Sequence, residues 1–223
     1  MRSCCLMAGA ASALAIGSLA LAAPTVSGFA GGDAAFLAIS ANSSLERAVT
    51  EARSGTPGNW AGAIWSPQGG VGAPQATLNH TWSNGAATSF SIVYDGASSL
   101  TFTLAGNTIS VATLAGSFTD IFVRVRSVGS ATVSVSDLDL VGSGLSIGAL
   151  TVAGAGVDYL RISNSGSAFG AFMITGKQTM SWTGPQPGGS QIAAQFKFTN
   201  VIPSSGTLSL AAVAGLLASR RRR

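Results

Sequence analysis

Hydrophobic and polar residues alternate along most of the chain after residue 60. In the segment 89–94 every even position is apolar (Phe, Ile and Tyr), and in the segment 99–104 the even positions are Leu, Phe and Leu. A period of two places successive side chains on opposite faces of a β-strand. Asp95 and Gly96 begin the short connection between the two segments, so the sequence predicts a β-hairpin here.

The same strand-like pattern recurs at the spacing typical of β-sandwiches. Further strands are predicted at residues 76–82, 109–111, 118–126, 131–141, 157–162, 168–175 and 191–199. Roughly nine or ten half-buried strands need a partner for their apolar faces. We therefore predict an all-β fold: a two-sheet antiparallel β-sandwich, jelly-roll-like, with one short N-terminal helix.

The alternation changes phase once within the segment 131–141. Val133 and Val135 are apolar at odd positions, whereas Leu138 and Leu140 are apolar at even ones. A slip of one residue turns every following side chain to the other face of the sheet. A β-bulge, or a break into two strands, is therefore predicted at Ser136-Asp137.

The short helix is predicted just after residue 42. Ser43 and Glu46 have the S-x-x-E spacing of a capping box, and Gly55 and Pro57 would end the helix. Apolar residues follow the helical spacing i, i+3, i+4, i+7 at Leu45, Ala48, Val49 and Ala52, and Arg47 could pair with Glu51.

Residues 1–30 have the pattern of a secretory signal peptide. Arg2 supplies the positive start, residues 6–21 form the apolar stretch, and Ala20-Leu21-Ala22 is an A-x-A-like cleavage site. A second candidate cleavage site follows Ala30, and an uncleaved membrane anchor is the alternative. We expect cleavage by signal peptidase.

Residues 201–223 have the pattern of a stop-transfer segment. Pro203 and Gly206 precede an uncharged apolar stretch at 207–219, and four arginines follow at Arg220, Arg221, Arg222 and Arg223. The apolar stretch is shorter than the ~20 residues that span a bilayer comfortably. Such a helix suits a transient membrane sorting signal better than a permanent anchor. The residues between the two ends, 31–200, are predicted to form the β-sandwich domain.

This tail resembles the PEP-CTERM class of C-terminal sorting signals. The resemblance lies in Ile202-Pro-Ser-Ser-Gly206, the Leu/Ala/Gly stretch that follows, and the terminal arginines. The chain departs from the class in having only Pro203 in place of a Pro-Glu-Pro core. The resemblance implies processing by an exosortase-like membrane enzyme. The alternative is a sortase signal of the L-P-x-T-G type, from which residues 202–206 differ at two positions.

Placing the charges along the chain argues against a nucleic-acid partner. The chain has a formal net charge of +4, but Arg2 and the last four arginines supply five positive charges. Residues 31–200 contain seven Lys or Arg against eight Asp or Glu, and no basic stripe. Both cysteines, Cys4 and Cys5, lie in the predicted signal peptide, so no disulfide or thiolate site is expected in the folded domain.

Few residues in the folded domain suggest chemistry. His80 is the sole histidine, which is too few for a His-rich zinc site, and a hydrolase would need it beside a serine and an acid. Asp137 and Asp139 could form a calcium site or a glycosidase pair, but outward acids on a strand usually serve solubility. The candidate ligand-binding residues are the four tryptophans, which could stack on sugar rings: Trp60, Trp65, Trp82 and Trp182. No catalytic residue, metal or cofactor is expected.

Residues 45–199 resemble the choice-of-anchor domains, most closely the type labelled W. The resemblance is carried, in order, by Gly58-Asn-Trp-Ala, Trp82-Ser-Asn-Gly, Phe90-Ser-Ile-Val-Tyr-Asp-Gly, Leu100-Thr-Phe-Thr-Leu-Ala-Gly, Phe118-Thr-Asp-Ile-Phe-Val-Arg-Val-Arg, Asp137-Leu-Asp-Leu and Asp158-Tyr-Leu. It implies an exported β domain and transfers no catalytic residues. We expect a non-enzymatic cell-surface or extracellular-matrix protein of structural or interaction type. A carbohydrate-binding module for surface polysaccharide is the alternative, with a secreted hydrolase third.

Overall fold

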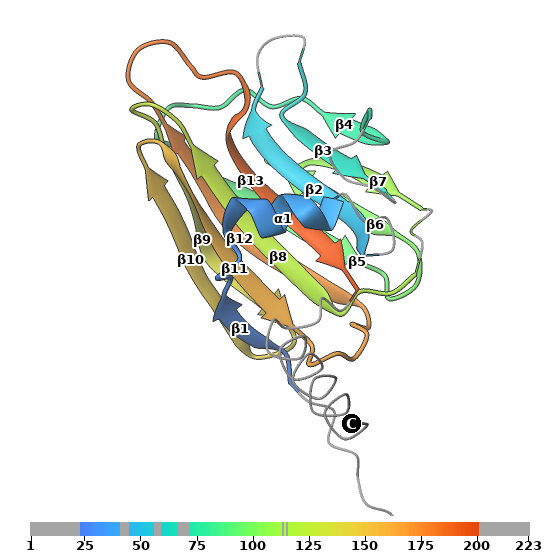
Figure 1. Ribbon diagram of the computed structural model, residues 1–223. Helices are drawn as coiled ribbons and strands as arrows, with labels where there is room; N and C mark the ends of the chain where they lie inside the picture. The colour runs from blue at the N-terminus through green and yellow to red at the C-terminus, as the bar shows by residue number, and fades with distance from the viewer. Residues whose placement is uncertain are drawn as a thin grey trace, which may run out of the picture.

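The fold is a sandwich of two antiparallel sheets, as predicted (Figure 1). The computed structural model describes residues 23–40, 45–55, 59–66, 72–112, 114 and 116–200. Sheet A has seven strands. In spatial order they are β1 (Thr25–Gly28), β11 (Gly156–Ser163), β8 (Asp120–Ser127), β13 (Gly189–Thr199), β2 (Glu46–Ser54), β3 (Gly62–Trp65) and β4 (Ala76–Leu78). Sheet B contains β10 (Leu145–Ala153), β9 (Thr132–Val141), β12 (Phe172–Ser181), β5 (Ala87–Tyr94), β6 (Leu100–Leu104) and β7 (Asn107–Val111).

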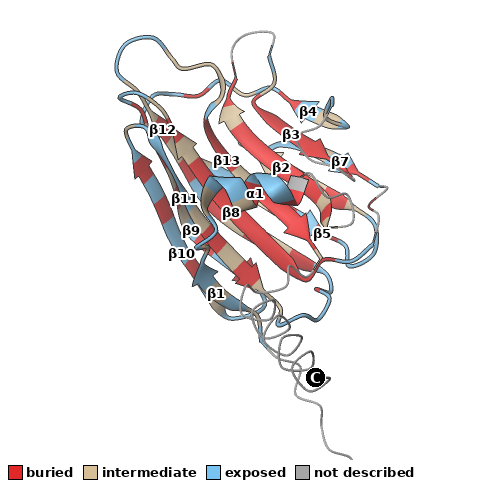
Figure 2. Ribbon diagram, viewed as in Figure 1, coloured by how far each residue is buried: buried red, intermediate tan, exposed pale blue. Residues whose placement is uncertain are grey.

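The hydrophobic core lies between the two sheets. Buried and more exposed residues alternate along β5, β6, β9 and β12 of sheet B. The central strands of sheet A, β8, β13 and β2, are instead buried along most of their length (Figure 2). Six of the largest fully buried side chains are aromatic, and four of these belong to the main core: Tyr94, Phe102, Phe118 and Phe198. In sheet B the period of two in the sequence therefore marks the two faces of the strands correctly.

The predicted hairpin is confirmed by the pairing of β5 with β6. Tyr94 lies opposite Leu100, and the Asp95 carboxylate closes the turn by accepting hydrogen bonds from the backbone N–H groups of residues 97–99. Gly96 has a φ of 87°, a left-handed conformation that glycine adopts without steric cost.

The predicted bulge at Ser136-Asp137 is also confirmed. Where β9 pairs with β12, Ser136 lies opposite Lys177 but Asp139 lies opposite Thr175, so β9 has one extra residue. Asp137 takes a φ of 52° at this point. The extra residue restores the inward direction of the side chains, which keeps both valines before it and both leucines after it in the core.

The helix predicted after residue 42 is wrong. Residues 46–54 form the central strand β2, which pairs with both β13 and β3. In a strand Ala48 and Ala52 face the core, while Val49 and Glu51 face outward. Arg47 does not pair with Glu51, which is instead bonded to residues of β13.

β2 lacks alternation in the sequence because both of its faces are covered. Seven of its nine residues are buried, including Glu46 and Glu51. The partners of these charged residues lie about 150 positions later in the chain, on β13, so no local pattern can indicate them. Pairing with two neighbouring strands overrides the helical spacing.

The one helix in the described residues is α1 (Gly32–Ser40), which lies across the outer face of sheet A in front of β8 and β13 (Figure 1). No helix in the described ranges is long and apolar enough to cross a membrane. The predicted sorting signal, 201–223, and most of the predicted signal peptide lie outside these ranges. Strand β1 lies within residues 1–30, so the sandwich includes part of the range assigned to the signal peptide.

Strand β1 occupies the edge of sheet A. Its first residue, Thr25, pairs with Ser163 of β11; Ser163 pairs with Asp120 of β8, and Asp120 with Thr199 of β13. The first residue of β1 and the last residue of β13 therefore lie in one row, at the same end of sheet A.

Three other strands differ from the prediction. β3 (Gly62–Trp65) was not predicted, and all four of its residues are buried. β4 ends at Leu78, so His80 is not in a strand. β10 was not predicted, because its pairing with β9 is irregular on both sides of Gly148. The buried positions of β10 consequently do not keep a period of two.

Candidate functional site

A row of polar side chains crosses the outer face of sheet A. Tyr159 of β11 pairs with Arg124 of β8, Arg124 with Gln195 of β13, and Gln195 with Glu51 of β2. Side chains of paired residues in neighbouring strands project from the same face of a sheet. The antiparallel register thus brings together four residues from distant parts of the sequence.

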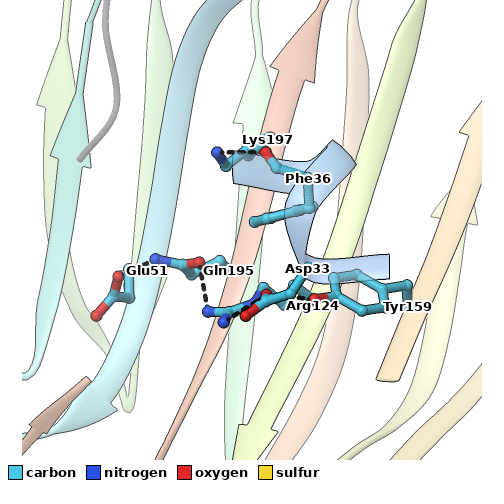
Figure 3. A network of polar contacts seen from close by, with 7 residues as sticks. All are labelled: Asp33, Phe36, Glu51, Arg124, Tyr159, Gln195 and Lys197. Atoms are coloured by element: carbon cyan, nitrogen blue, oxygen red, sulfur yellow. Dashed lines mark hydrogen bonds and ion pairs between the residues drawn. The ribbon is translucent and has the colours of Figure 1, made fainter. Parts of the chain in front are cut away.

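Hydrogen bonds connect this row to helix α1 (Figure 3). Arg124 Nε donates to Asp33 Oδ1 at 2.9 Å, and its Nη1 donates to Gln195 Oε1 at 3.3 Å. Gln195 Nε2 donates in turn to Glu51, and the Tyr159 hydroxyl donates to Asp33. The five side chains form one network from β11 to β2.

Asp33 joins the helix to the sheet. It lies in the first turn of α1, where the positive end of the helix dipole favours a carboxylate. Burial alone would raise its pKa, but the hydrogen bond from Tyr159 and the charge of Arg124 outweigh burial and hold the pKa below its usual range. Asp33 is therefore an ionised partner of Arg124 at neutral pH.

A buried lysine, Lys197, lies beneath α1, two residues after Gln195 on β13. Lys197 Nζ is 3.1 Å from Glu46 Oε2 and donates to the backbone carbonyl oxygen of Phe36 at 3.1 Å. It also lies 4.3 Å from the centroid of the Phe36 ring. Burial lowers the pKa of Lys197, while the carboxylate of Glu46 opposes this shift.

Aromatic packing holds α1 on the sheet. Phe36 and Ile39 of the helix are buried against Phe122 of β8, with Phe29 and Tyr159 at the edge of the cluster. Leu37, by contrast, is 54% exposed on the other side of the helix. The helix thus covers one part of the outer face of sheet A and leaves the adjoining part open.

The open part is a groove of about 600 Å³ beside α1, within the ~300–1,000 Å³ typical of ligand sites. Its polar lining includes most of the network and two further arginines, Arg53 of β2 and Arg126 of β8. Both arginines lie opposite Ala193 of β13, one on each side. Adjacent strands are ~4.8 Å apart, which places the two Cα atoms ~10 Å apart across a small residue.

Arg53 is held by neutral oxygen atoms. Its Nη2 donates to Asn59 Oδ1 at 2.7 Å, its Nε to the backbone carbonyl oxygen of Trp60 at 3.2 Å, and its Nη1 to Ser190 Oγ at 3.4 Å. The guanidinium lies over the Trp60 ring, 3.0 Å from the centroid. The side chain is therefore fixed in position while its charge has no carboxylate in contact among the described residues.

Two of the four tryptophans, Trp60 and Trp65, line the groove. Their rings meet edge to face, with centroids 5.2 Å apart and planes at 75°, and Trp65 is buried. Trp82 is buried in the core and donates to the backbone carbonyl oxygen of Arg53. Trp182 packs against the main core at a separate place. The tryptophans do not form one coplanar platform.

The other candidate residues lie apart from the groove. The His80 ring packs edge to face on Trp82, its Nε2 is buried without a hydrogen-bond partner, and burial lowers its pKa. No serine or carboxylate among the described residues bonds to it. Asp137 pairs with Lys177 at 2.9 Å on the outer face of sheet B, and Asp139 lies beside it. The described residues contain no group of three or more potential metal ligands from His, Cys, Asp and Glu.

Sequence reasoning identified only the two tryptophans of this site. The cationic and amide residues did carry a local signal: Arg124 and Arg126 alternate with valines in one strand, and Gln195 and Lys197 alternate with apolar residues in another. In a chain with so few charges, two strands with charges on one face indicate a polar site. Their pairing with Glu51 and Asp33 depends on sheet order, which the sequence pattern does not give.

Compared with protein-family models and with curated proteins, the sequence matches none. The class of the protein is therefore defined by its fold and its site: a β-sandwich with a polar, partly aromatic groove on one sheet. Both carboxylates that line the groove are engaged, Asp33 by Arg124 and Tyr159, and Glu51 by Ser190 and Gln195. This arrangement presents fixed hydrogen-bonding groups and positive charge to a bound molecule.

Proposed function

We propose that this protein is an exported cell-surface or extracellular-matrix component of non-enzymatic, interaction type, and that it binds its partner in the groove beside α1. The observation that carries the proposal is the network from Tyr159 to Glu51. It fixes the groove-lining side chains before any ligand arrives, which lowers the entropic cost of binding. Both of its carboxylates are already bonded, Asp33 to Arg124 and Tyr159 and Glu51 to Ser190 and Gln195, an arrangement suited to recognition.

Export is part of the same proposal. Signal peptidase would act at the N-terminal end and an exosortase-like enzyme at the tail around Pro203 and Gly206, with the C-terminal helix in the membrane until then. The pairing of β1 with β11 supports cleavage after Ala22, because cleavage after Ala30 would remove an edge strand of sheet A. It would also remove Phe29, whose ring lies 5.0 Å from that of Phe122.

The finer architecture belongs to this proposal too. We infer a jelly-roll-like sandwich, and the chain path supports it. Successive strands pass from one sheet to the other, as in β10 to β11, β11 to β12 and β12 to β13.

Mass spectrometry of the native protein tests the export and processing proposal. Cells that produce the full chain are fractionated, and both mature termini are determined. We expect a mature protein that begins at Ala23, ends near residue 205, and is found in the envelope or the medium. An intact chain from Met1 to Arg223 in the cytoplasmic fraction would refute export.

A carbohydrate-binding module is the second candidate, favoured by the position of Trp60 and Trp65 in the groove. Aromatic side chains with adjacent hydrogen-bonding groups are suited to sugar rings, which combine apolar faces with hydroxyls. Retention of the protein on immobilised polysaccharide, and loss of retention in Trp60→Leu, would support this candidate. Unchanged retention in that variant would argue against it.

A further inference from the structure

Positive charge is concentrated in the groove. Four of the seven Lys and Arg residues between 31 and 200 line it, against two of the eight acids, Asp33 and Glu51. Adding Glu46, the partner of Lys197, still leaves four cations against three carboxylates. The groove is thus positive in a domain whose other charged residues are mostly acidic.

Two of these cations remain available to a ligand. Arg124 and Lys197 have carboxylate partners, at 2.8 Å and 3.1 Å respectively. Arg53 bonds to neutral oxygen atoms, and Arg126 makes no hydrogen bond or ion pair within the described part of the chain. Both side chains are half-buried, and neither has a carboxylate partner that a ligand would have to displace.

We propose that the groove binds an acidic polysaccharide, whose sugar carboxylates are bonded by Arg126 and Arg53. This inference rests on the proposed function in taking the groove as the binding site, and it adds the chemical class of the ligand. Guanidinium groups bind carboxylates through paired N–H donors. The two arginines, ~10 Å apart on either side of Ala193, can bond to separate carboxylates of one chain.

The remaining lining residues favour a sugar over an acidic peptide. Trp60 and the exposed Leu37 provide apolar surface for the C–H faces of sugar rings, and Ser190 and Gln195 provide hydrogen-bonding groups for hydroxyls. The groove lies across the strands rather than along an open strand edge, so it offers no backbone pairing to a peptide. Nucleic acid is disfavoured, because its binding depends on many phosphate contacts and this site has two cations without a carboxylate partner among the described residues.

The experiment measures binding of full-length chain, purified in detergent, to polygalacturonate by isothermal titration calorimetry. Fully methyl-esterified polygalacturonate has the same sugar backbone without the charges, and poly-L-glutamate has the charges without the sugar. The test variant is Arg126→Gln. Its matched control is Lys177→Gln, which removes one positive charge from the exposed outer face of sheet B.

We expect wild type and Lys177→Gln to bind polygalacturonate equally. Arg126→Gln should bind about tenfold more weakly, which corresponds to loss of one charge-assisted hydrogen bond. The methyl ester and poly-L-glutamate should bind at least about tenfold more weakly than polygalacturonate. Equal thermal unfolding of Arg126→Gln and wild type would show that the variant is folded, as expected for a side chain without bonded partners.

Equal binding of the methyl ester would overturn the role of the carboxylates, and equal binding of poly-L-glutamate would overturn the choice of a sugar. An unchanged affinity in Arg126→Gln would overturn the assignment of the site. These results do not depend on where the protein is found. A chain that binds but is not exported would contradict only the proposed export, and an exported chain that does not bind would contradict only this inference.

Discussion

Replacing Phe36 with alanine should release helix α1 from sheet A. The Phe36 side chain is 0% exposed and contacts three parts of the site. Its ring lies 5.4 Å from that of Tyr159, 4.3 Å from the Lys197 ammonium and 5.5 Å from the Arg124 guanidinium carbon. Removal of this ring leaves the helix with Ile39 as its only other fully enclosed apolar contact.

The expected cost is about 3 kcal/mol. Truncating a buried Phe to Ala costs ~3–5 kcal/mol, and the low end applies because water can enter from the outer face of the sheet. A helix of nine residues has little stability of its own, so its position depends on this packing. The sandwich itself should remain folded, since domains of this size are stable by ~5–15 kcal/mol.

Urea denaturation followed by tryptophan fluorescence measures the loss, and amide hydrogen exchange in α1 locates it. Leu37→Ala is the matched control, because Leu37 is the next residue of the helix and is 54% exposed. Its cost should be below about 0.5 kcal/mol. A difference of less than about 1 kcal/mol between the two variants would refute the conclusion that Phe36 fastens the helix.

Three further predictions concern backbone geometry and charge. A Cβ at Gly176 would lie 2.8 Å from a ring atom of Phe90 in the core, whereas one at Gly170 would meet nothing within 4 Å. In urea denaturation Gly176→Ala should therefore lose about 1–3 kcal/mol of unfolding free energy and Gly170→Ala almost none. Equal losses in the two variants would contradict the packing described. Asp137→Val should lower the thermal midpoint more than Asp139→Val, because a β-branched residue is strained at the positive φ of Asp137; a larger drop for Asp139→Val would argue against the bulge. The pKa of Asp33 is lower in the folded state than in the unfolded chain, so its contribution is present above pH ~4 and is lost as the pH falls through the folded pKa. Asp33→Asn should accordingly be less stable than wild type in urea at pH ~7, and the gap should narrow as the pH falls below ~4; a gap that does not change in acid would exclude ionisation as its cause.

The architecture of the sandwich could be predicted from the sequence wherever one face of a strand is buried and the other exposed. The hairpin at Asp95-Gly96 and the bulge at Asp137 both follow from the phase of the alternation, which records the side of the sheet that each residue occupies. Prediction failed at β2, where Glu46 and Glu51 are buried among partners from β13. With both faces covered, the alternation disappears and helical spacing arises by coincidence.

The groove was less predictable than the fold for a related reason. A binding site on a sheet is assembled from residues that are neighbours across strands, and the order of strands does not appear in local patterns. Arg126 and Arg53 lie on opposite sides of Ala193 only because β13 pairs with both β8 and β2. The tryptophans were recognisable by residue type alone. This criterion correctly identified Trp60 and Trp65, but it also included Trp82 and Trp182, which lie outside the groove.

The row that joins Thr25 to Thr199 sets the orientation of the domain on any surface that holds it. The described chain enters sheet A at Thr25 and leaves it at Thr199, both at one end of the sheet. Arg126 is six residues along β8 from Asp120 of that row, or ~20 Å at ~3.3 Å per residue. Under the proposed export, a tether at either terminus would leave Arg126 and Arg53 at the end of the domain that lies away from the point of attachment.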